Sequence, residues 1–119
     1  MDKNRRKELA EQYSNMPVYM GVAQVKNEVN GKIYICSFTN MKNKWFTIKL
    51  SLDSNMHVNA ELQEDWNRLG DEAFSYTILE EKPVDRVFDK KLEAGKMERE
   101  WAEKLQPFGD RGYNKPYKD

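Results

Sequence analysis

The chain has 119 residues, with 20 basic and 20 acidic side chains, a length that fits one domain and a net charge of zero. The balanced charge gives no support to the strongly basic class of nucleic-acid-binding proteins. A single cysteine, Cys36, excludes an internal disulfide, and a polar start without a long apolar run gives no sign of secretion or membrane insertion, so we expect a cytoplasmic protein.

The first residues of the chain are rich in charge and favour a helix. Leu9, Tyr13 and Met16 recur there at helical spacing, and Pro17 then ends the segment. We therefore predict an N-terminal helical extension over residues 1–16, followed by a single domain over residues 17–119.

Two strand-like segments, residues 18–26 and 32–38, flank the dipeptide Asn30-Gly31. This dipeptide is typical of a two-residue type I′ turn, in which both central residues need a positive φ. Such a turn without a bulge would place Tyr34 opposite Asn27 and Ala23 opposite Phe38. Ala23 and Tyr34 would then lie on the same side of the sheet.

Four more elements are expected after this hairpin. Apolar residues at helical spacing predict helices over residues 40–53 and 60–69, and an alternating pattern predicts a strand over residues 74–80. A last helical region over residues 84–105 contains Gly95, which predicts two pieces or a weak join. The order predicts an α+β domain with a small three-stranded antiparallel sheet, formed by the N-terminal hairpin and one later strand and flanked by helices.

An ordered set of short motifs follows these elements: Gly21-Val22-Ala23, Tyr34-Ile35-Cys36, Leu62 through Asn67, Phe74 through Leu79, Glu98-Arg99-Glu100-Trp101 and Gly112-Tyr113-Asn114. In this order and spacing the chain resembles small stand-alone members of the GIY-YIG nuclease superfamily. The resemblance implies that family's fold and cleavage of a phosphodiester bond with one divalent metal ion. Mg²⁺ or Mn²⁺ is expected, since such hard cations prefer carboxylate and phosphate oxygens.

The resemblance also implies a set of site residues, and part of that set is replaced here. The tyrosine of the second motif is retained as Tyr34, whereas the tyrosine of the first motif falls on Ala23 and the glycine of the second on Cys36. The arginine that neutralises the phosphate is Lys44, which supplies charge without a planar fork. A histidine position one helical turn later is Ile48, which also completes an apolar helix face.

Three further positions match the family pattern, and each has a structural interpretation beside the functional one. Glu98 matches the glutamate that binds the metal, yet it flanks an apolar helix stripe and could be a solvated residue. His57 matches a polar site position, yet it follows a loop and could be a surface residue. Asn114 could pin the backbone of the tail, and Tyr34 itself could be a packed aromatic residue.

Three functional hypotheses follow. The first is a GIY-YIG endonuclease-like protein whose hydrolysis is impaired or lost and which is retained for binding DNA, RNA or a protein partner. The second is an active endonuclease with a rearranged site of Tyr34, Lys44, His57 and Glu98. The third is a non-catalytic protein-interaction module, which the net charge near zero favours over nucleic-acid binding. A space between these site residues filled by Ile48 and Phe38 would favour the first hypothesis over the second.

Overall fold

The structure, a computed structural model, describes residues 17–117, so the helical extension predicted for residues 1–16 lies outside the described residues. One antiparallel sheet contains β1 (Tyr19–Asn27), β2 (Ile33–Phe38) and β3 (Phe74–Pro83), in the order β2-β1-β3. The helices are α2 (Lys44–Asp53), α3 (Ala60–Leu69) and α4 (Lys90–Leu105), with short 3-10 helices η1 (Asp71–Ala73) and η2 (Gly109–Arg111). The predicted α+β architecture with a three-stranded sheet is confirmed.

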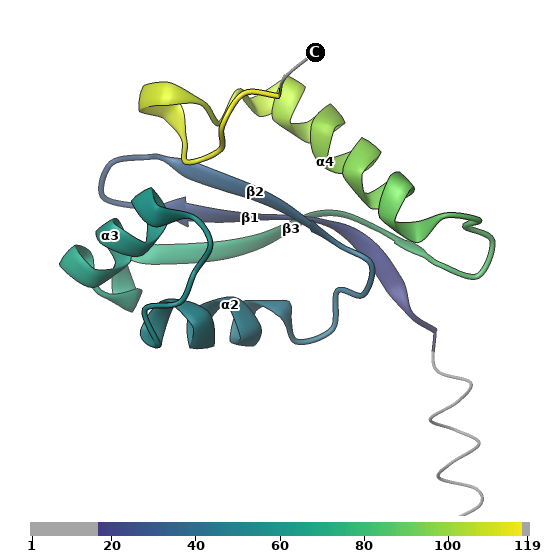
Figure 1. The fold of residues 1–119 in the computed structure, drawn as a ribbon, viewed down its shortest axis with the longest axis horizontal. Helices are drawn as coiled ribbons and strands as arrows, with labels where there is room; N and C mark the ends of the chain where they lie inside the picture. The colour runs from purple at the N-terminus through teal and green to yellow at the C-terminus, as the bar shows by residue number, and fades with distance from the viewer. Residues whose placement is uncertain (1–16, 118–119) are drawn as a thin grey trace, which may run out of the picture.

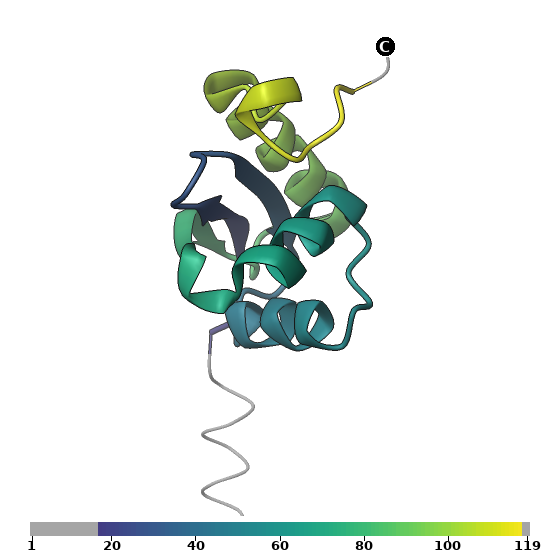
Figure 2. The same ribbon diagram turned by 90° about the vertical axis from the view of Figure 1, so that its left-hand side faces the viewer.

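The sheet is covered by helices on both faces. Helix α4 packs on one face, and α2 and α3 cover the other, while the tail after α4 returns to β2 (Figures 1 and 2). The central strand β1 alternates between the two layers: Ala23 and Val25 face α2 and α3, whereas Met20 and Val22 face α4. None of the helices in the described part of the chain has the length and apolar character that crossing a membrane requires.

The loop between β1 and β2 differs from the predicted two-residue turn. Five residues, 28–32, connect the strands. The Gly31 N–H donates to the Asn27 carbonyl at 2.8 Å, and Gly31 has a φ of 80° while Asn30 has no positive φ. The side chain of Asn27 accepts the Val29 N–H at 2.9 Å and so stabilises the longer loop. The prediction that Asn30 and Gly31 close the loop alone was therefore wrong.

The longer loop changes the strand register by two residues. Tyr34 pairs with Val25 rather than Asn27, and Ala23 pairs with Cys36 rather than Phe38. Because side chains alternate with a period of two, a shift of two residues leaves each side chain on its predicted face. Ala23 and Tyr34 therefore do lie on the same side of the sheet.

Two helices begin later than the sequence pattern indicated. Helix α2 begins at Lys44, and α4 begins at Lys90, after Asp89 accepts the Leu92 N–H at 3.1 Å as an N-terminal cap. The predicted interruption at Gly95 was wrong, since α4 is continuous through it. The cost of one helical glycine, about 1 kcal/mol, is outweighed here by the packing of the apolar face of α4 against the sheet.

Candidate active site

Tyr34 and His57 are in contact on the face of the sheet that α2 and α3 cover. Their ring centroids are 5.4 Å apart, with the rings nearly perpendicular. The loop before α3 fixes the histidine: its backbone N–H donates to Gln63 Oε1 at 3.1 Å, and its Nδ1 accepts the Asn59 N–H at 3.0 Å. A neutral imidazole with an accepting Nδ1 carries its proton on Nε2. Of the predicted site residues, this pair is brought together directly.

Both side chains of this pair are uncharged near pH 7. Burial raises the pKa of Tyr34 to about 12, and the neighbouring Cys36 and Glu98 add to the rise. Burial also lowers the pKa of His57 below its usual value. The Tyr34 hydroxyl is therefore a hydrogen-bond donor rather than a ready base. The acceptor nitrogen of His57, Nδ1, already accepts the Asn59 N–H.

Glu98 reaches the site from α4, on the other face of the sheet. Its Oε1 accepts a hydrogen bond from Ser37 Oγ at 3.1 Å, and its Oε2 accepts one from the Tyr117 hydroxyl at 2.8 Å. The strand β2 is an edge strand, so groups from both faces meet along its outer edge. The charge of Glu98 makes a smaller contribution than burial to the raised pKa of Tyr34.

Asn114 contacts the backbone of the same edge strand. Its Oδ1 accepts the Ile35 N–H at 2.8 Å, and its Nδ2 donates to the Ile35 carbonyl at 2.9 Å. The Tyr113 N–H adds a hydrogen bond to the Ile33 carbonyl at 2.9 Å. These bonds pin the tail along β2, which is the structural interpretation of Asn114, and a part in the chemistry remains a prediction.

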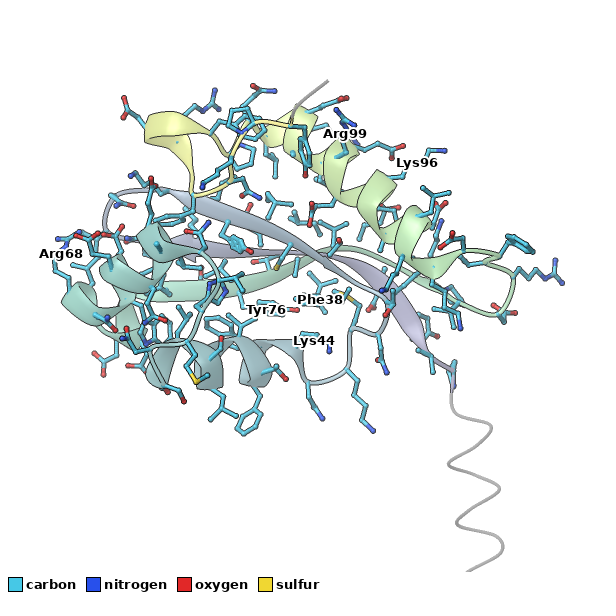
Figure 3. The ribbon with its side chains drawn as sticks, viewed as in Figure 1. Phe38, Lys44, Arg68, Tyr76, Lys96 and Arg99 are labelled. Atoms are coloured by element: carbon cyan, nitrogen blue, oxygen red, sulfur yellow. The ribbon has the colours of Figure 1, made fainter. Side chains whose placement is uncertain are left out.

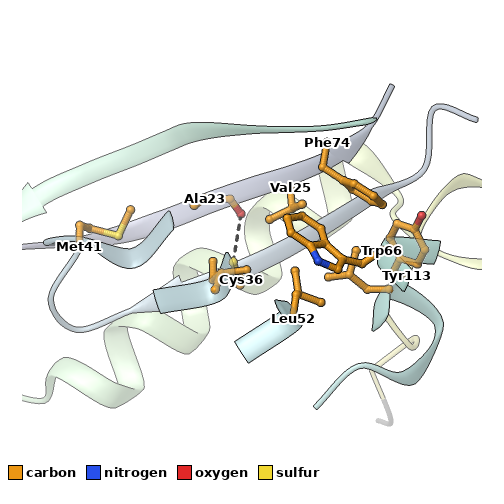
Figure 4. Close-up of a cluster of buried hydrophobic side chains, with 10 residues drawn as sticks. Ala23, Val25, Cys36, Met41, Leu52, Trp66, Phe74 and Tyr113 are labelled. Atoms are coloured by element: carbon orange, nitrogen blue, oxygen red, sulfur yellow. Dashed lines mark hydrogen bonds between the residues drawn. The ribbon is translucent and has the colours of Figure 1, made fainter. Parts of the chain in front are cut away.

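The replaced positions form hydrophobic core. Ala23 is fully buried and lies in one cluster with Cys36 (Figure 4). Ile48, which is 8 % exposed, belongs to the same cluster, and Phe38 packs against it. Lys44 points its Nζ over the Phe38 ring, 5.4 Å from the centroid. Figure 3 shows Lys44 and Phe38 on the α2 side of the sheet, whereas Arg99, the neighbour of Glu98, lies on the α4 side. Ile48 and Phe38 thus belong to the apolar layer on this face of the sheet.

A cavity opens beside Tyr34 between α3 and the tail. It has a volume of about 580 Å³ and is lined by Tyr34, residues 58–61 and residues 112–116, together with Gly109. Glu61 and Lys115 bring opposite charges to its wall. Of the predicted site residues, Tyr34 and Asn114 line this cavity.

The side chains of the candidate site fit a divalent cation that is held weakly, and they do not form a site in which protein ligands alone surround the metal. Residues 17–117 contain no group of three His, Cys, Asp or Glu side chains that could hold a metal ion. Mg²⁺ usually keeps several waters and is bound through one or two carboxylates together with substrate phosphates. The half-buried Glu98 has a carboxylate of the kind that such a site requires, and its role as a metal ligand remains a prediction.

Two residues of this site, Ser37 and Tyr117, were not predicted from the sequence. Ser37 directly follows the second motif, and its neighbours on alternate positions of β2 indicate the face it lies on, but nothing in its local pattern points to Glu98. Tyr117 lies in a polar tail without periodicity. Only the docking of that tail on β2 brings its hydroxyl to the carboxylate.

The chain was compared with known proteins. Over 66 residues, 56% of its length, it is 32% identical to the intron-associated endonuclease 1 of Enterobacteria phage T4, and this match spans 26% of that protein. The catalytic domain of homing endonuclease I-TevI superimposes with a TM-score of 0.65 at 30% identity, covering 80% of this chain and 96% of that domain. A variant of the same catalytic domain gives a TM-score of 0.66 at 29% identity, covering 81% of this chain and 92% of that domain.

No family model matches the chain. The chain nevertheless accounts for nearly the whole length of a solved endonuclease domain, at an identity that exceeds what a shared fold alone requires. The order of strands and helices, and the motifs placed on them, agree with that similarity. The chain therefore belongs to the GIY-YIG nuclease family.

Proposed function

We propose that this protein is an endonuclease-type domain that binds nucleic acid at the β2 edge and hydrolyses phosphodiester bonds slowly, with Mg²⁺ or Mn²⁺. The proposal rests on one observation: some of the predicted site positions keep a polar side chain, and others are buried in the core. Tyr34, His57 and Glu98 remain around the edge of β2, whereas Ala23 and Ile48 are buried core. Slow hydrolysis is expected because only part of the family's set of site residues is present.

Each retained group has a role that its surroundings support. Glu98 would hold the metal ion, which supplies charge neutralisation for the phosphate when bound. Tyr34 donates a hydrogen bond that orients a water molecule or a phosphate oxygen, since its pKa of about 12 keeps the hydroxyl protonated. Lys44 contributes positive charge from α2, without the two-pronged contact of an arginine.

Impairment follows from the missing proton acceptor and the missing arginine. Neither Tyr34 nor His57 is a ready base at neutral pH, for the reasons given above. Loss of a general base or of a preorganised electrostatic group commonly costs about 10²- to 10³-fold in rate. We expect cleavage at least about 10²-fold slower than that of a family member with the complete set.

The test is cleavage of plasmid DNA, single-stranded DNA and RNA with Mg²⁺ or Mn²⁺. The wild-type protein is compared with Glu98→Gln, and the I-TevI catalytic domain serves as the reference. We expect slow metal-dependent nicking that Glu98→Gln abolishes, and gel retardation of nucleic acid that weakens with salt. Cleavage as fast as that of the reference would refute the impairment, and neither cutting nor retardation would refute the proposal as a whole.

A protein-interaction role is the second candidate, and exposed apolar side chains favour it. Phe46 and Leu50 lie one turn apart on α2 and are 67% and 55% exposed, and Met56 after the helix is 77% exposed. Contiguous exposed apolar surface often marks a partner site. A protein that fails to retard nucleic acid and co-purifies with a partner only when Phe46 and Leu50 are intact would favour this role.

A further inference from the structure

The carboxylate of Glu98 is held from two sides by hydroxyl groups of distant segments. Ser37 on β2 donates to Oε1, and Tyr117 in the tail donates to Oε2, at 3.1 and 2.8 Å. An ionised carboxylate has about four lone-pair positions, so two hydrogen bonds leave two positions for a cation. The carboxylate is therefore oriented without being saturated.

The ring of Tyr117 is placed by contacts that do not involve its hydroxyl. The guanidinium of Arg99 lies over the ring, 5.0 Å from its centroid, and Phe108 packs against it edge-on at 6.5 Å. Three residues earlier, Asn114 ties the tail to the Ile35 backbone with two hydrogen bonds. Removing the hydroxyl alone should consequently leave the ring and the tail in place.

We propose that Tyr117 is a positioning residue for Glu98: its hydroxyl orients the carboxylate that binds the divalent cation. This inference rests on the proposed function. Hydrogen-bonded partners that orient a metal-binding carboxylate typically contribute 10- to 100-fold in affinity or activity. The Tyr117 phenol belongs to the tail after α4. On β1, the position that matches the tyrosine of the first family motif is Ala23, which has no hydroxyl.

The electrostatics agree with this placement. Burial raises the pKa of Tyr117 above its usual value, and the neighbouring Glu98 raises it further, with a smaller contribution from Tyr34. The direct observation of this placement is the hydrogen bond from the Tyr117 hydroxyl to Glu98 Oε2. The hydroxyl remains protonated at neutral pH and can act only as a donor to the carboxylate.

The experiment measures metal binding by the free protein, so that its result does not depend on cleavage. Mn²⁺ is titrated into isotopically labelled protein, and its dissociation constant is taken from the paramagnetic broadening of the backbone amide signals around Ser37 and Glu98. Tyr117→Phe is the test variant, and Glu98→Gln defines the signal without the ligand. Tyr19→Phe is the matched control, since Tyr19 is 40% exposed against 37% for Tyr117.

We expect Tyr117→Phe to weaken Mn²⁺ binding about tenfold or more, while Tyr19→Phe binds as wild type does. Equal binding by Tyr117→Phe and wild type, with Glu98→Gln weaker, would overturn the inference and leave the proposed function standing. Tighter binding of Mn²⁺ by Tyr117→Phe would overturn it as well, since the Tyr117 hydroxyl would then block the cation from the carboxylate. Equal binding by wild type and Glu98→Gln would refute the metal site itself, and the proposed function with it.

Discussion

The hydroxyl of Tyr76 is a buried polar atom that has no hydrogen-bond partner among residues 17–117. The ring of Tyr76 stacks on Trp45 at 5.3 Å, on the same face of the sheet as Tyr34. A buried hydroxyl without a partner costs about 1–3 kcal/mol. We therefore expect Tyr76→Phe, which keeps the ring, to raise the free energy of unfolding by about 1 kcal/mol in urea denaturation.

Tyr113→Phe is the matched substitution with the opposite expected sign. The Tyr113 hydroxyl donates to Asp65 Oδ2 at 2.7 Å and accepts from Asn27 Nδ2 at 3.0 Å. Removing it leaves a buried amide and a carboxylate without that partner, so the free energy of unfolding should fall by about 1–3 kcal/mol. Equal losses of stability in the two variants would show that the Tyr76 hydroxyl is satisfied in solution.

At the residue scale, which side chains are buried could be predicted from the sequence better than which side chains contact one another. That Ile48 joins an apolar helix face could be inferred from helical spacing, and the structure places it in the core. The contact of Tyr34 with His57 depends on the loop before α3, and the bond from Tyr117 to Glu98 depends on a tail with no periodic pattern. Periodicity carries no information on such long-range side-chain contacts.

The edge strand β2 is protected by the tail, which is the element that completes the site. Asn114 satisfies both the N–H and the carbonyl of Ile35 on this otherwise open edge. We expect Asn114→Ala to lower the free energy of unfolding by about 1–3 kcal/mol, because two hydrogen bonds of about 0.5–1.5 kcal/mol each are lost. Amide hydrogen exchange should accelerate at Ile35.

Asn40→Ala is the control for this change. The Asn40 side chain accepts only a local bond, from the exposed Lys42 N–H at 3.0 Å, so its loss should leave the exchange at Ile35 unaltered. Unchanged protection of Ile35 in Asn114→Ala would show that the tail is held on β2 by its other contacts. In that case the placement of Tyr117 would not depend on Asn114.

At the element scale, strands and helices were predictable, and their ends and connections were less so. The strand-like segments around Asn30-Gly31 predicted β1 and β2, and the alternating apolar residues predicted β3. The loop of the hairpin was mispredicted because the side chain of Asn27 stabilises a five-residue connection that competes with the type I′ turn. The start of α4 is set by the Asp89 cap rather than by the first apolar residue.

Across the whole molecule, the part of the candidate site around Tyr34 borders one of the two core layers. The cluster beneath α2 and α3 includes Ala23, Cys36 and Ile48, and it extends to the retained Tyr34 at its border. Burial of these apolar side chains stabilises the domain by roughly 25 cal/mol per Å² of apolar surface. The apolar side chains of Ala23, Cys36 and Ile48 therefore contribute to the stability of the domain.

The stability of the whole domain should depend on the protonation of His57, the only histidine in the chain. Burial lowers its pKa below the usual 6.5, while the unfolded chain keeps the usual value. As pH falls through 6.5, the unfolded chain therefore binds a proton that the folded chain does not, and stability decreases until the pH falls below the pKa of the folded state.

His57→Gln should remove this dependence between roughly pH 7 and pH 5, as measured by urea unfolding at several pH values. Asp65 serves as an internal reference. Although burial acts to raise its pKa, hydrogen bonds from Tyr113 and Arg68 hold it below 3.8, so its stabilisation is lost only in more acidic solution, where wild type and variant should weaken alike. Parallel curves for the two proteins above that range would mean that His57 titrates as freely in the folded domain as in the unfolded chain, and that the loop before α3 does not bury it in solution.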